Sequence, residues 1–298
     1  MDGQHRDFSY EQAFSRNVGW VTQAEQAQLK SKRVAIAGLG GVGGFHLQTL
    51  ARLGIGEFSI ADFDVFDIVN FNRQAGAMMS TLGRRKIDVL AEQTRDINPE
   101  VDLRLFDQGV TADNLDDFLR GADLYVDGLD FFAFEARRAT FAACARLGIP
   151  AVTAAPLGMS AALLVFLPGA MTFEEYFQLD GLPELEQAVH FLVGLAPAAM
   201  HIEYLVDPTR LDLANRRGPS TPMACYLCAG VAATEGLKIM LGRGDVLAAP
   251  WAHQFDAFSN RLKRTRRENG NSHPLQRRRI SALKKQVYEI ARLQGLIT

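Results

Sequence analysis

The sequence has 298 residues, of which 48% are hydrophobic and 22% charged, and its formal net charge is −2. This is enough apolar material to bury one large core, in one domain or two. The longest apolar run, at residues 161–167, is far shorter than the roughly 18 residues of a membrane span. Three cysteines are too few for a disulfide framework, and the N-terminus carries no apolar signal segment. We therefore expect a cytoplasmic protein that does not enter a membrane.

The first 155 residues alternate short apolar strands with helices. We expect strands at residues 33–38, 57–62, 103–106, 124–127 and 151–155, with helices at 45–53, 83–97, 113–120 and 135–147 between them. Strands that alternate with helices in this way form a parallel sheet with helices on both faces. The sequence therefore predicts an α/β fold of the Rossmann-like, doubly wound type.

The pattern changes after residue 156. Residues 161–167 are expected to extend the mainly parallel sheet in the antiparallel sense, 225–241 to form a long apolar helix, and 254–262 to form a late strand. An apolar stripe at helical spacing marks a final amphipathic helix: Ile280, Leu283, Val287, Ile290 and Leu293. We thus expect an N-terminal helical arm over 1–30, one domain over 31–260 with an insertion at 169–222, and a basic tail over 261–298.

The turn GLGGVGG, at positions 38–44, follows the first expected strand and opens the first helix. The glycines at Gly38, Gly40, Gly41 and Gly43 permit a tight turn close to phosphate, and the helix N-terminus offers free N–H groups. Asp62 ends the second strand, where an acid hydrogen-bonds ribose hydroxyls. On these residues alone, a dinucleotide site for NAD or FAD is the favoured interpretation.

The segment behind this acid carries polar and basic side chains that a dinucleotide site does not need. Asn70 and Arg73 lie in ADFDVFDIVNFNRQ at 61–74, and Lys86 follows twelve residues later. A nucleoside triphosphate carries dense negative charge, and Arg and Lys donors stabilise the charge that develops when attack at its α-phosphate expels pyrophosphate. Each cation alone also fits a solvated surface position, so it is the cluster that favours ATP.

Four motifs in this order and spacing resemble the ThiF/MoeB/HesA superfamily, the relatives of ubiquitin-activating enzymes. They are GLGGVGG, DFDVFDIVNFNRQ, GRRKID and, at 127–130, DGLD; the resemblance runs from about residue 10 to 165, with an echo at 230–242. It implies a single ThiF-type domain that uses ATP and Mg²⁺ to adenylate the carboxylate of an acceptor. The superfamily's acceptors are small ubiquitin-like or sulfur-carrier proteins, peptides, small molecules or a tRNA base.

The resemblance also implies roles for single residues. Asp62 would hold the ribose, Asp130 would bind Mg²⁺, and Arg16, in FSRNVG, would reach the phosphates from the partner subunit of a homodimer. Further nucleotide contacts, with Arg73 and Lys86 also counted as catalytic, would come from Asp64, Asn70, Arg73, Gln74 and Lys86. Because a carboxylate is already ionised at neutral pH, no general base is required.

Two cysteine features differ from many relatives. The paired CxxC motifs that bind zinc are missing from 168–173 and 259–269, so we expect no structural zinc. Cys225 and Cys228 form one pair at helical spacing, which favours core residues. Some relatives form a thioester on a cysteine near this point, and a helix N-terminus would lower the thiol pKa. Adenylation without a thioester is the favoured interpretation, with Cys225 as nucleophile the alternative.

The basic tail indicates a partner without identifying it. Residues 261–298 hold eleven Lys and Arg against two acids, while the rest of the chain holds 21 basic and 32 acidic residues. Such a tail suits a tRNA or an acidic carrier protein, or it has no partner. Two other classes also remain open: an NAD(P)-dependent oxidoreductase and a non-catalytic ThiF-like scaffold.

Overall fold

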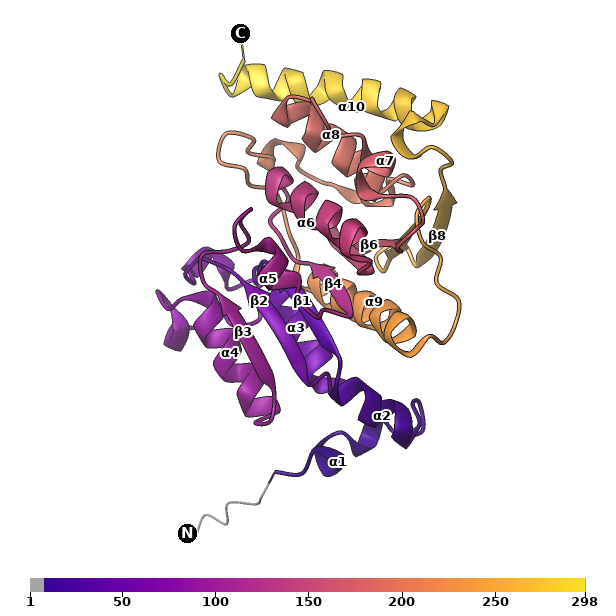
Figure 1. Ribbon diagram of the computed structural model, residues 1–298. Helices are drawn as coiled ribbons and strands as arrows, with labels where there is room; N and C mark the ends of the chain where they lie inside the picture. The colour runs from indigo at the N-terminus through magenta and orange to yellow at the C-terminus, as the bar shows by residue number, and fades with distance from the viewer. Residues whose placement is uncertain (1–7, 298) are drawn as a thin grey trace.

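A single eight-stranded sheet organises the protein. The computed structural model describes residues 8–297, and its strands follow the order β3-β2-β1-β4-β5-β6-β7-β8 (Figure 1). The strands are β1 Arg33–Ala37, β2 Glu57–Ala61, β3 Asp102–Phe106, β4 Leu124–Asp127, β5 Ala151–Leu157, β6 Ser160–Phe166, β7 Trp251–Asp256 and β8 Arg261–Arg266. The first five pair in parallel, and the last three extend the sheet in antiparallel fashion. The α/β fold with an antiparallel extension is therefore confirmed.

The strand order reverses at β1. This strand pairs with β2 on one side and with β4 on the other, so the connections leaving β1 and β4 diverge to opposite faces of the sheet. In open parallel sheets, ligands bind at this switch point, outside the carboxyl ends of the strands. The fold thus places the candidate site beyond the ends of β1 and β4.

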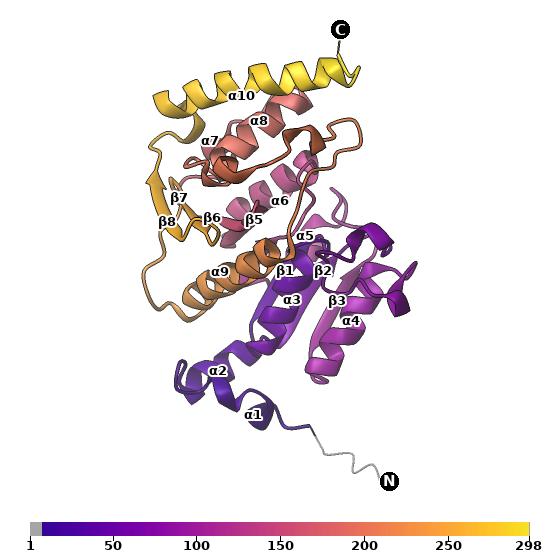
Figure 2. The ribbon, with the colours of Figure 1, turned by 180° about the vertical axis from the view of Figure 1, so that it is seen from behind.

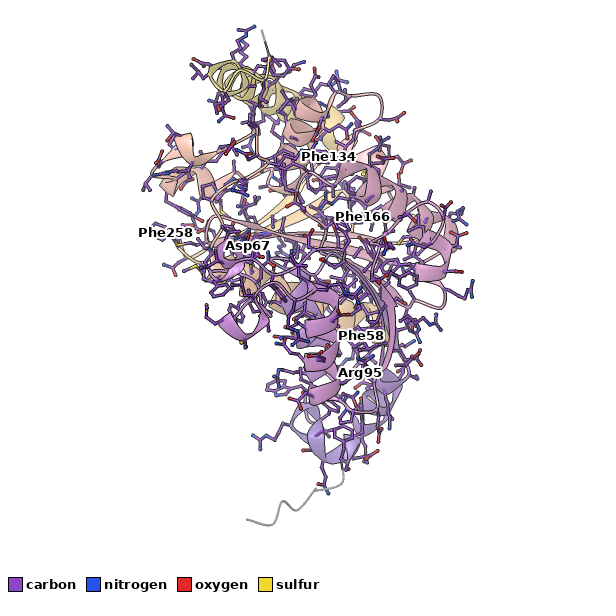
Figure 3. All side chains as sticks on the ribbon, turned by 90° about the vertical axis from the view of Figure 1, so that its left-hand side faces the viewer. Phe58, Asp67, Arg95, Phe134, Phe166 and Phe258 are labelled. Atoms are coloured by element: carbon purple, nitrogen blue, oxygen red, sulfur yellow. The ribbon has the colours of Figure 1, made fainter. Side chains whose placement is uncertain are left out.

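Helices cover both faces of the sheet (Figures 1 and 2). The helices are α1 Tyr10–Ala13, α2 Gln23–Lys30, α3 Gly43–Arg52, α4 Lys86–Ile97, α5 Leu115–Leu119, α6 Phe134–Leu147, α7 Phe173–Phe177, α8 Glu184–Leu195, α9 Pro222–Leu241 and α10 Pro274–Leu293. One core lies between the sheet and α3, α4 and α9, and contains Phe58. A second core lies on the opposite face beneath α5 to α8, and contains Phe134 and Phe166 (Figure 3).

Local sequence signals end several of the helices. Gly148 after α6 and Gly242 after α9 adopt the left-handed conformation, with φ of 72° and 61°, that lets a chain leave a helix. At the start of α2, Thr22 and Glu25 form a reciprocal capping box. These caps explain why the helix boundaries expected from sequence lie close to the observed ones.

Helix α9 is long and apolar enough to span a membrane, and it is the one helix among residues 8–297 with that length and composition. It packs against β5, β6 and α3, and Cys228, Ala229 and Ala232 are buried in the first core. This placement is that of a core helix, whose apolar character comes from burial on the sheet.

The expected single strand at 254–262 is wrong, because the structure has a hairpin there. Strand β7 ends at Asp256, whose carboxylate accepts hydrogen bonds from the N–H and hydroxyl of Ser259, and Asn260 takes the left-handed conformation. These residues turn the chain so that β8 pairs along the whole of β7. The boundary expected at residue 260 therefore falls inside one continuous sheet.

The expected basic tail is also part of the folded body. Its first residues form β8, and its amphipathic stripe forms α10, which packs against α8 at the end of the molecule opposite the N-terminal arm (Figure 1). Val287 and Ala291 are buried in that contact, and Lys284 pairs with Glu186 at 2.6 Å. Apolar packing therefore fixes one side of α10 and leaves its basic side exposed.

Candidate functional site

The glycine turn connects β1 to α3 at the switch point. Gly38 has a φ of +82°, and a Cβ there would lie 2.3 Å from the carbonyl oxygen of Gly128. A Cβ on Gly43 would lie 1.7 Å from the carbonyl oxygen of Gly38. Both positions therefore require glycine, and the turn packs directly on the segment that follows β4.

The turn presents unused hydrogen-bond donors at the start of α3. Within residues 8–297, no protein acceptor lies in hydrogen-bonding range of the N–H groups of Gly40, Gly41 and Val42. Free N–H groups at a helix N-terminus attract anions, because they carry the positive end of the helix dipole. The turn is therefore suited to phosphate.

Asp62 lies against the turn from the end of β2. Its Oδ2 accepts a 2.7 Å hydrogen bond from the N–H of Leu39, and its Oδ1 accepts one of 2.8 Å from Asp64. Burial raises the pKa of the Asp62 carboxyl, although these hydrogen bonds and nearby Lys86 oppose the increase. Lys86, buried at the start of α4, pairs with Asp64 at 2.8 Å. The acid and the cation are thus held next to the glycines.

The segment 70–74 forms another wall of the site. Asn70 is buried, and its side-chain oxygen accepts the N–H of Asp67 at 2.9 Å, which closes a short turn. Gln74 is buried beside the glycine turn, where its Nε2 lies 3.7 Å from the position of a Cβ on Gly40. Its Oε1 is buried without a partner among the described residues. An orphaned polar atom at this place is an acceptor available to a ligand.

Arg73 is partly exposed and lies on the glycine side of this segment. Its Nε lies 4.0 Å from the position of a Cβ on Gly41, and its Nη1 donates to the carbonyl of Val69 and the side chain of Asn72, both at 3.0 Å. Asn72 in turn donates to the carbonyl of Ser220, just before α9. The guanidinium is therefore oriented beside the turn, and its remaining N–H donors have no acceptor among the described residues.

Asp130 lies on the loop that follows β4, and its side chain is exposed. One oxygen, Oδ1, accepts the N–H of Phe132 at 3.1 Å, which leaves the other without a protein partner in the described chain. Because the glycine turn touches Gly128 and Leu129 of the same loop, Asp130 lies at the edge of the site. One exposed carboxylate together with nucleotide phosphates is a ligand set that Mg²⁺ accepts.

Arg16 is not brought to this cluster within the chain. It lies exposed in a short 3₁₀ helix, Ser15–Asn17, and the neighbouring Asn17 donates to the carbonyl of Leu53 at the C-terminal end of α3. The glycine turn is at the other end of that helix, roughly 15 Å away at 1.5 Å per residue. Arg16 therefore cannot serve the site of its own chain in this arrangement.

Cys225 and Cys228 are buried in the core beside the site, whereas Cys144 is buried in the second core. Cys225 lies with its Sγ 3.7 Å from the position of a Cβ on Gly41, and burial raises its pKa to about 11. The expected lowering of this pKa is wrong, because burial outweighs the opposing effects of Arg73 and of a hydrogen bond from Ser220. Across residues 8–297, no group of three or more His, Cys, Asp and Glu side chains is arranged to hold a metal ion.

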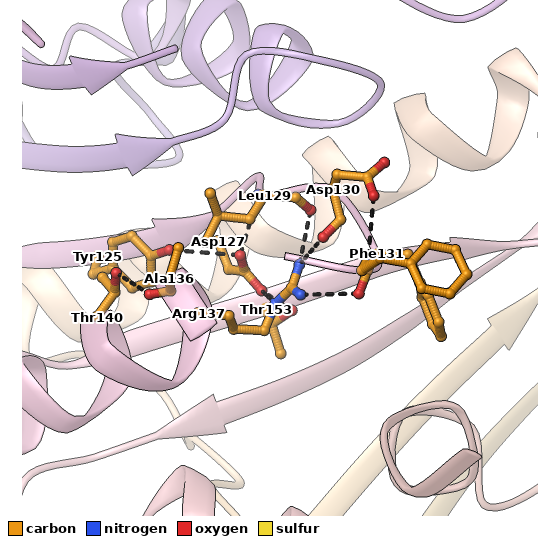
Figure 4. A network of polar contacts seen from close by, with 10 residues as sticks. Tyr125, Asp127, Leu129, Asp130, Phe131, Ala136, Arg137, Thr140 and Thr153 are labelled. Atoms are coloured by element: carbon orange, nitrogen blue, oxygen red, sulfur yellow. Dashed lines mark hydrogen bonds and ion pairs between the residues drawn. The ribbon is translucent and has the colours of Figure 1, made fainter. Parts of the chain in front are cut away.

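A buried ion pair that the sequence did not reveal lies under the Asp130 loop (Figure 4). Arg137 of α6 donates through Nε to Asp127 Oδ2 at 2.8 Å, and both side chains are almost fully buried. Thr153 of β5 donates to the same oxygen at 2.9 Å. Arg137 was missed because one arginine in a helix has no distinguishing spacing; its only signal was the acid at the end of β4.

Comparisons with known proteins give the family of this chain. The model of the ThiF family matches residues 14–276. The tRNA threonylcarbamoyladenosine dehydratase of Haemophilus influenzae is 37% identical over 123 residues, 41% of this chain and 47% of the relative. The sulfur carrier protein ThiS adenylyltransferase of Escherichia coli is 32% identical over 143 residues, 48% of this chain and 56% of the relative. The chain thus spans about half the length of these curated relatives.

A solved structure extends the likeness of fold over most of the chain. The crystal structure of Escherichia coli MccB with ATP has a TM-score of 0.64, covering 92% of this chain and 75% of that chain at 18% identity. The family match includes the glycine turn, the segment 70–74, Lys86 and the Asp130 loop. On this match, the chain belongs to the ThiF family.

Proposed function

We propose that this protein is an ATP-dependent adenylyltransferase that activates a carboxylate. One observation carries the proposal: free N–H groups of the glycine turn, Arg73, Lys86 and the loop with the exposed carboxylate of Asp130 all lie around the switch point. In the reaction, a carboxylate oxygen of the acceptor forms a bond to the α-phosphorus of ATP. The bond to the β-phosphate oxygen breaks, and pyrophosphate leaves with the electron pair.

Each residue of the site is proposed to contact a different part of the nucleotide. Asp62 is proposed to accept hydrogen bonds from the ribose, and the amides of the turn to hold phosphate oxygens. Arg73 and Lys86 would stabilise the charge that develops on the leaving pyrophosphate. Asn70, Gln74 and Asp64 would complete the nucleotide contacts. Asp130 would hold Mg²⁺, which neutralises phosphate charge when bound.

The cations and the free carboxylate favour ATP over a dinucleotide. A pyrophosphate bridge needs the glycine amides but not a buried lysine and an adjacent guanidinium. The structures of MccB with ATP and of the Escherichia coli dehydratase with ATP support the same choice by analogy of fold. Tighter binding of NADH than of Mg-ATP, measured by calorimetry, would contradict it.

We further propose a homodimer in which Arg16 serves the neighbouring subunit. Arg16 is exposed at the end of α3 away from its own site, beside Trp20, of which 86% is exposed. An arginine supplied by a second subunit acts on phosphate as arginine fingers do. Mixing Arg16→Ala with Arg73→Ala subunits tests this: mixed dimers are expected to regain one intact site, whereas complete inactivity of the mixture would contradict it.

The acceptor is proposed to be a small carrier protein, a peptide or a small molecule that presents a carboxylate. One relative adenylates ThiS, and a solved structure shows MccB with a derivative of the peptide MccA. A cytoplasmic location, where ATP is plentiful, suits this chemistry. ATP–pyrophosphate exchange with candidate carboxylates is the test.

RNA is a second candidate acceptor, favoured by one surface. Arg278, Lys285 and Arg292 are exposed on α10 at intervals of seven residues, and none of the three is ion-paired with another described residue. Two helical turns separate successive members, so they form a row along one side of the helix. Rows of cations bind phosphate backbones without sequence demands. Three relatives are named tRNA threonylcarbamoyladenosine dehydratases, in line with this candidate.

A further inference from the structure

The guanidinium of Arg137 is bonded to the backbone of the loop that carries Asp130. Besides the Asp127 carboxylate, it donates to the carbonyl of Leu129 at 2.8 Å, to that of Asp130 at 2.9 Å and to that of Phe131 at 3.2 Å (Figure 4). Three consecutive carbonyls thus converge on one planar cation. Because the donors of a guanidinium have fixed directions, they fix the relative directions of these carbonyls.

The cation is itself held from several sides. The Asp127 carboxylate accepts hydrogen bonds from the hydroxyl of Thr153 at 2.9 Å and from the N–H of Leu129 at 3.2 Å. The guanidinium carbon of Arg137 lies 4.7 Å from the centre of the Phe191 ring. Arg137 and Asp127 are only 2% and 3% exposed. A buried ion pair with this many partners has little freedom to shift. The loop is therefore attached to a rigid point at the junction of β4, β5 and α6.

The loop needs such support at its exposed end. Asp130 Oδ1 is used by the N–H of Phe132, so the direction of the free oxygen depends on the backbone at 129–132. That same backbone packs on the glycine turn through Gly128 and Leu129. The position of Asp130 relative to the phosphate-binding amides is thus determined by the carbonyls that Arg137 holds.

We propose that Arg137 is a positioning residue for Mg²⁺ binding at Asp130. This inference rests on the proposed function of the site. Lysine at this position keeps the charge beside Asp127 but offers one nitrogen, which cannot reach three carbonyls in fixed directions. Removing support from a metal ligand typically lowers metal affinity by about 10-fold or more.

The test compares Arg137→Lys with Arg138→Lys in the full chain. Arg138 is the next residue of α6, and it pairs on the surface with Glu174 at 2.8 Å and Asp180 at 2.6 Å, so its substitution is a matched control. Binding of a non-hydrolysable ATP analogue is measured by calorimetry over a series of Mg²⁺ concentrations, and the melting temperature is recorded. Thr153→Val is a milder variant for use if Arg137→Lys does not fold.

We expect Arg137→Lys to need about 10-fold more Mg²⁺ for half-maximal enhancement of nucleotide binding, with Mg²⁺-free binding unchanged. Arg138→Lys should match the wild type, and Thr153→Val should shift in the same direction by less. An unchanged Mg²⁺ requirement in Arg137→Lys and Thr153→Val, even with lowered melting temperatures, overturns the inference. Mg²⁺-dependent binding without any adenylation would instead refute the proposed activity while leaving this inference standing.

Discussion

The carboxylate of Asp62 accepts a 2.7 Å hydrogen bond from the backbone N–H of Leu39, in the middle of the glycine turn. This contact joins the end of β2 to the turn after β1, and it fixes the acid beside the amides that are proposed to hold phosphate. It also buries a carboxylate, which folding alone would not favour. The buried Asp62 carboxylate therefore lowers the stability of the fold at a position that is proposed to bind the nucleotide.

Replacing Asp62 by Asn should separate these two effects. Because burial raises the pKa of Asp62 in the folded state, ionisation costs stability as the pH rises from about 4 through the raised pKa. Asn keeps an acceptor for Leu39 and loses the one for the N–H of Asp64, a loss that removal of the buried charge should offset. We expect unfolding at pH 7 to require as much denaturant as in the wild type or more, and ATP binding to weaken by about 10-fold to 100-fold. Lower stability with unchanged ATP affinity would contradict this.

Arg73→Ala should remove catalysis without harming the fold. Its side chain is partly exposed and makes only local hydrogen bonds, so we expect the unfolding free energy to change by about 0.5 kcal/mol or less. Loss of a donor to developing phosphate charge should lower the ATP–pyrophosphate exchange rate by about 10² to 10³. Arg84→Ala, which breaks a surface pair with Glu92, is the control and should keep the wild-type rate.

His46 should make the protein sensitive to mild acid. It is fully buried on α3 with neither ring nitrogen bonded to another described residue, and burial lowers its pKa to about 4. As the pH falls, His46 therefore takes up its proton first in the unfolded state. The stability that neutral His46 contributes is complete above pH ~6.5 and is lost as the pH falls toward 4. His46→Leu should recover on the order of 3 kcal/mol at pH 4 relative to pH 7. The unfolding free energy of each protein is measured by urea titration at both pH values. A loss of stability between pH 7 and pH 4 as large in His46→Leu as in the wild type would contradict the account.

Cys225 should react slowly as a nucleophile. With a pKa near 11 and a buried side chain, only about 10⁻³ of it is thiolate at pH 8. Iodoacetamide should modify the native protein far more slowly than the urea-unfolded protein, as followed by mass spectrometry. Cys225→Ala should retain ATP–pyrophosphate exchange. Rapid alkylation, or a thioester that disappears in Cys225→Ala, would restore the nucleophile hypothesis.

The basic row of α10 predicts the salt dependence of RNA binding. Changing Arg278, Lys285 and Arg292 to Glu should lower the slope of log affinity against log salt by about 2 to 3, at roughly 0.7 to 0.9 per phosphate contact. A control with the same charge change uses three exposed arginines of the body: Arg52, Arg95 and Arg104. Equal RNA binding by both triple variants in filter assays would exclude this surface as the contact.

The sequence predicted the parallel half of the fold because each strand and helix there carries its own signals. Glycines and apolar periodicity mark the unit from β1 to β2, and the caps at Gly148 and Gly242 end their helices where expected. The β7–β8 hairpin was missed because its turn depends on Asp256 and Asn260, neither of which forms a recognised turn pair. Local pattern could not show that β8 has a strand to pair with.

The candidate site was predictable only as far as the family motifs reach. They indicated Asp62, Arg73, Lys86 and Asp130, which lie in segments that the fold brings to one edge of the sheet. The support beneath them was not predictable, since Arg137 meets the Asp130 loop through tertiary contacts alone. The high pKa of Cys225 likewise depends on packing that no local sequence signal records.

ATP–pyrophosphate exchange tests the central claim most directly. The protein is incubated with Mg-ATP, labelled pyrophosphate and separate pools of small proteins, peptides and RNA, alongside Asp130→Ala and Arg73→Ala. We expect one pool to support incorporation of label into ATP by the wild type, and both variants to lose it. Absence of exchange with every pool, from a protein that binds Mg-ATP, would contradict the adenylyltransferase and favour a nucleotide-binding scaffold.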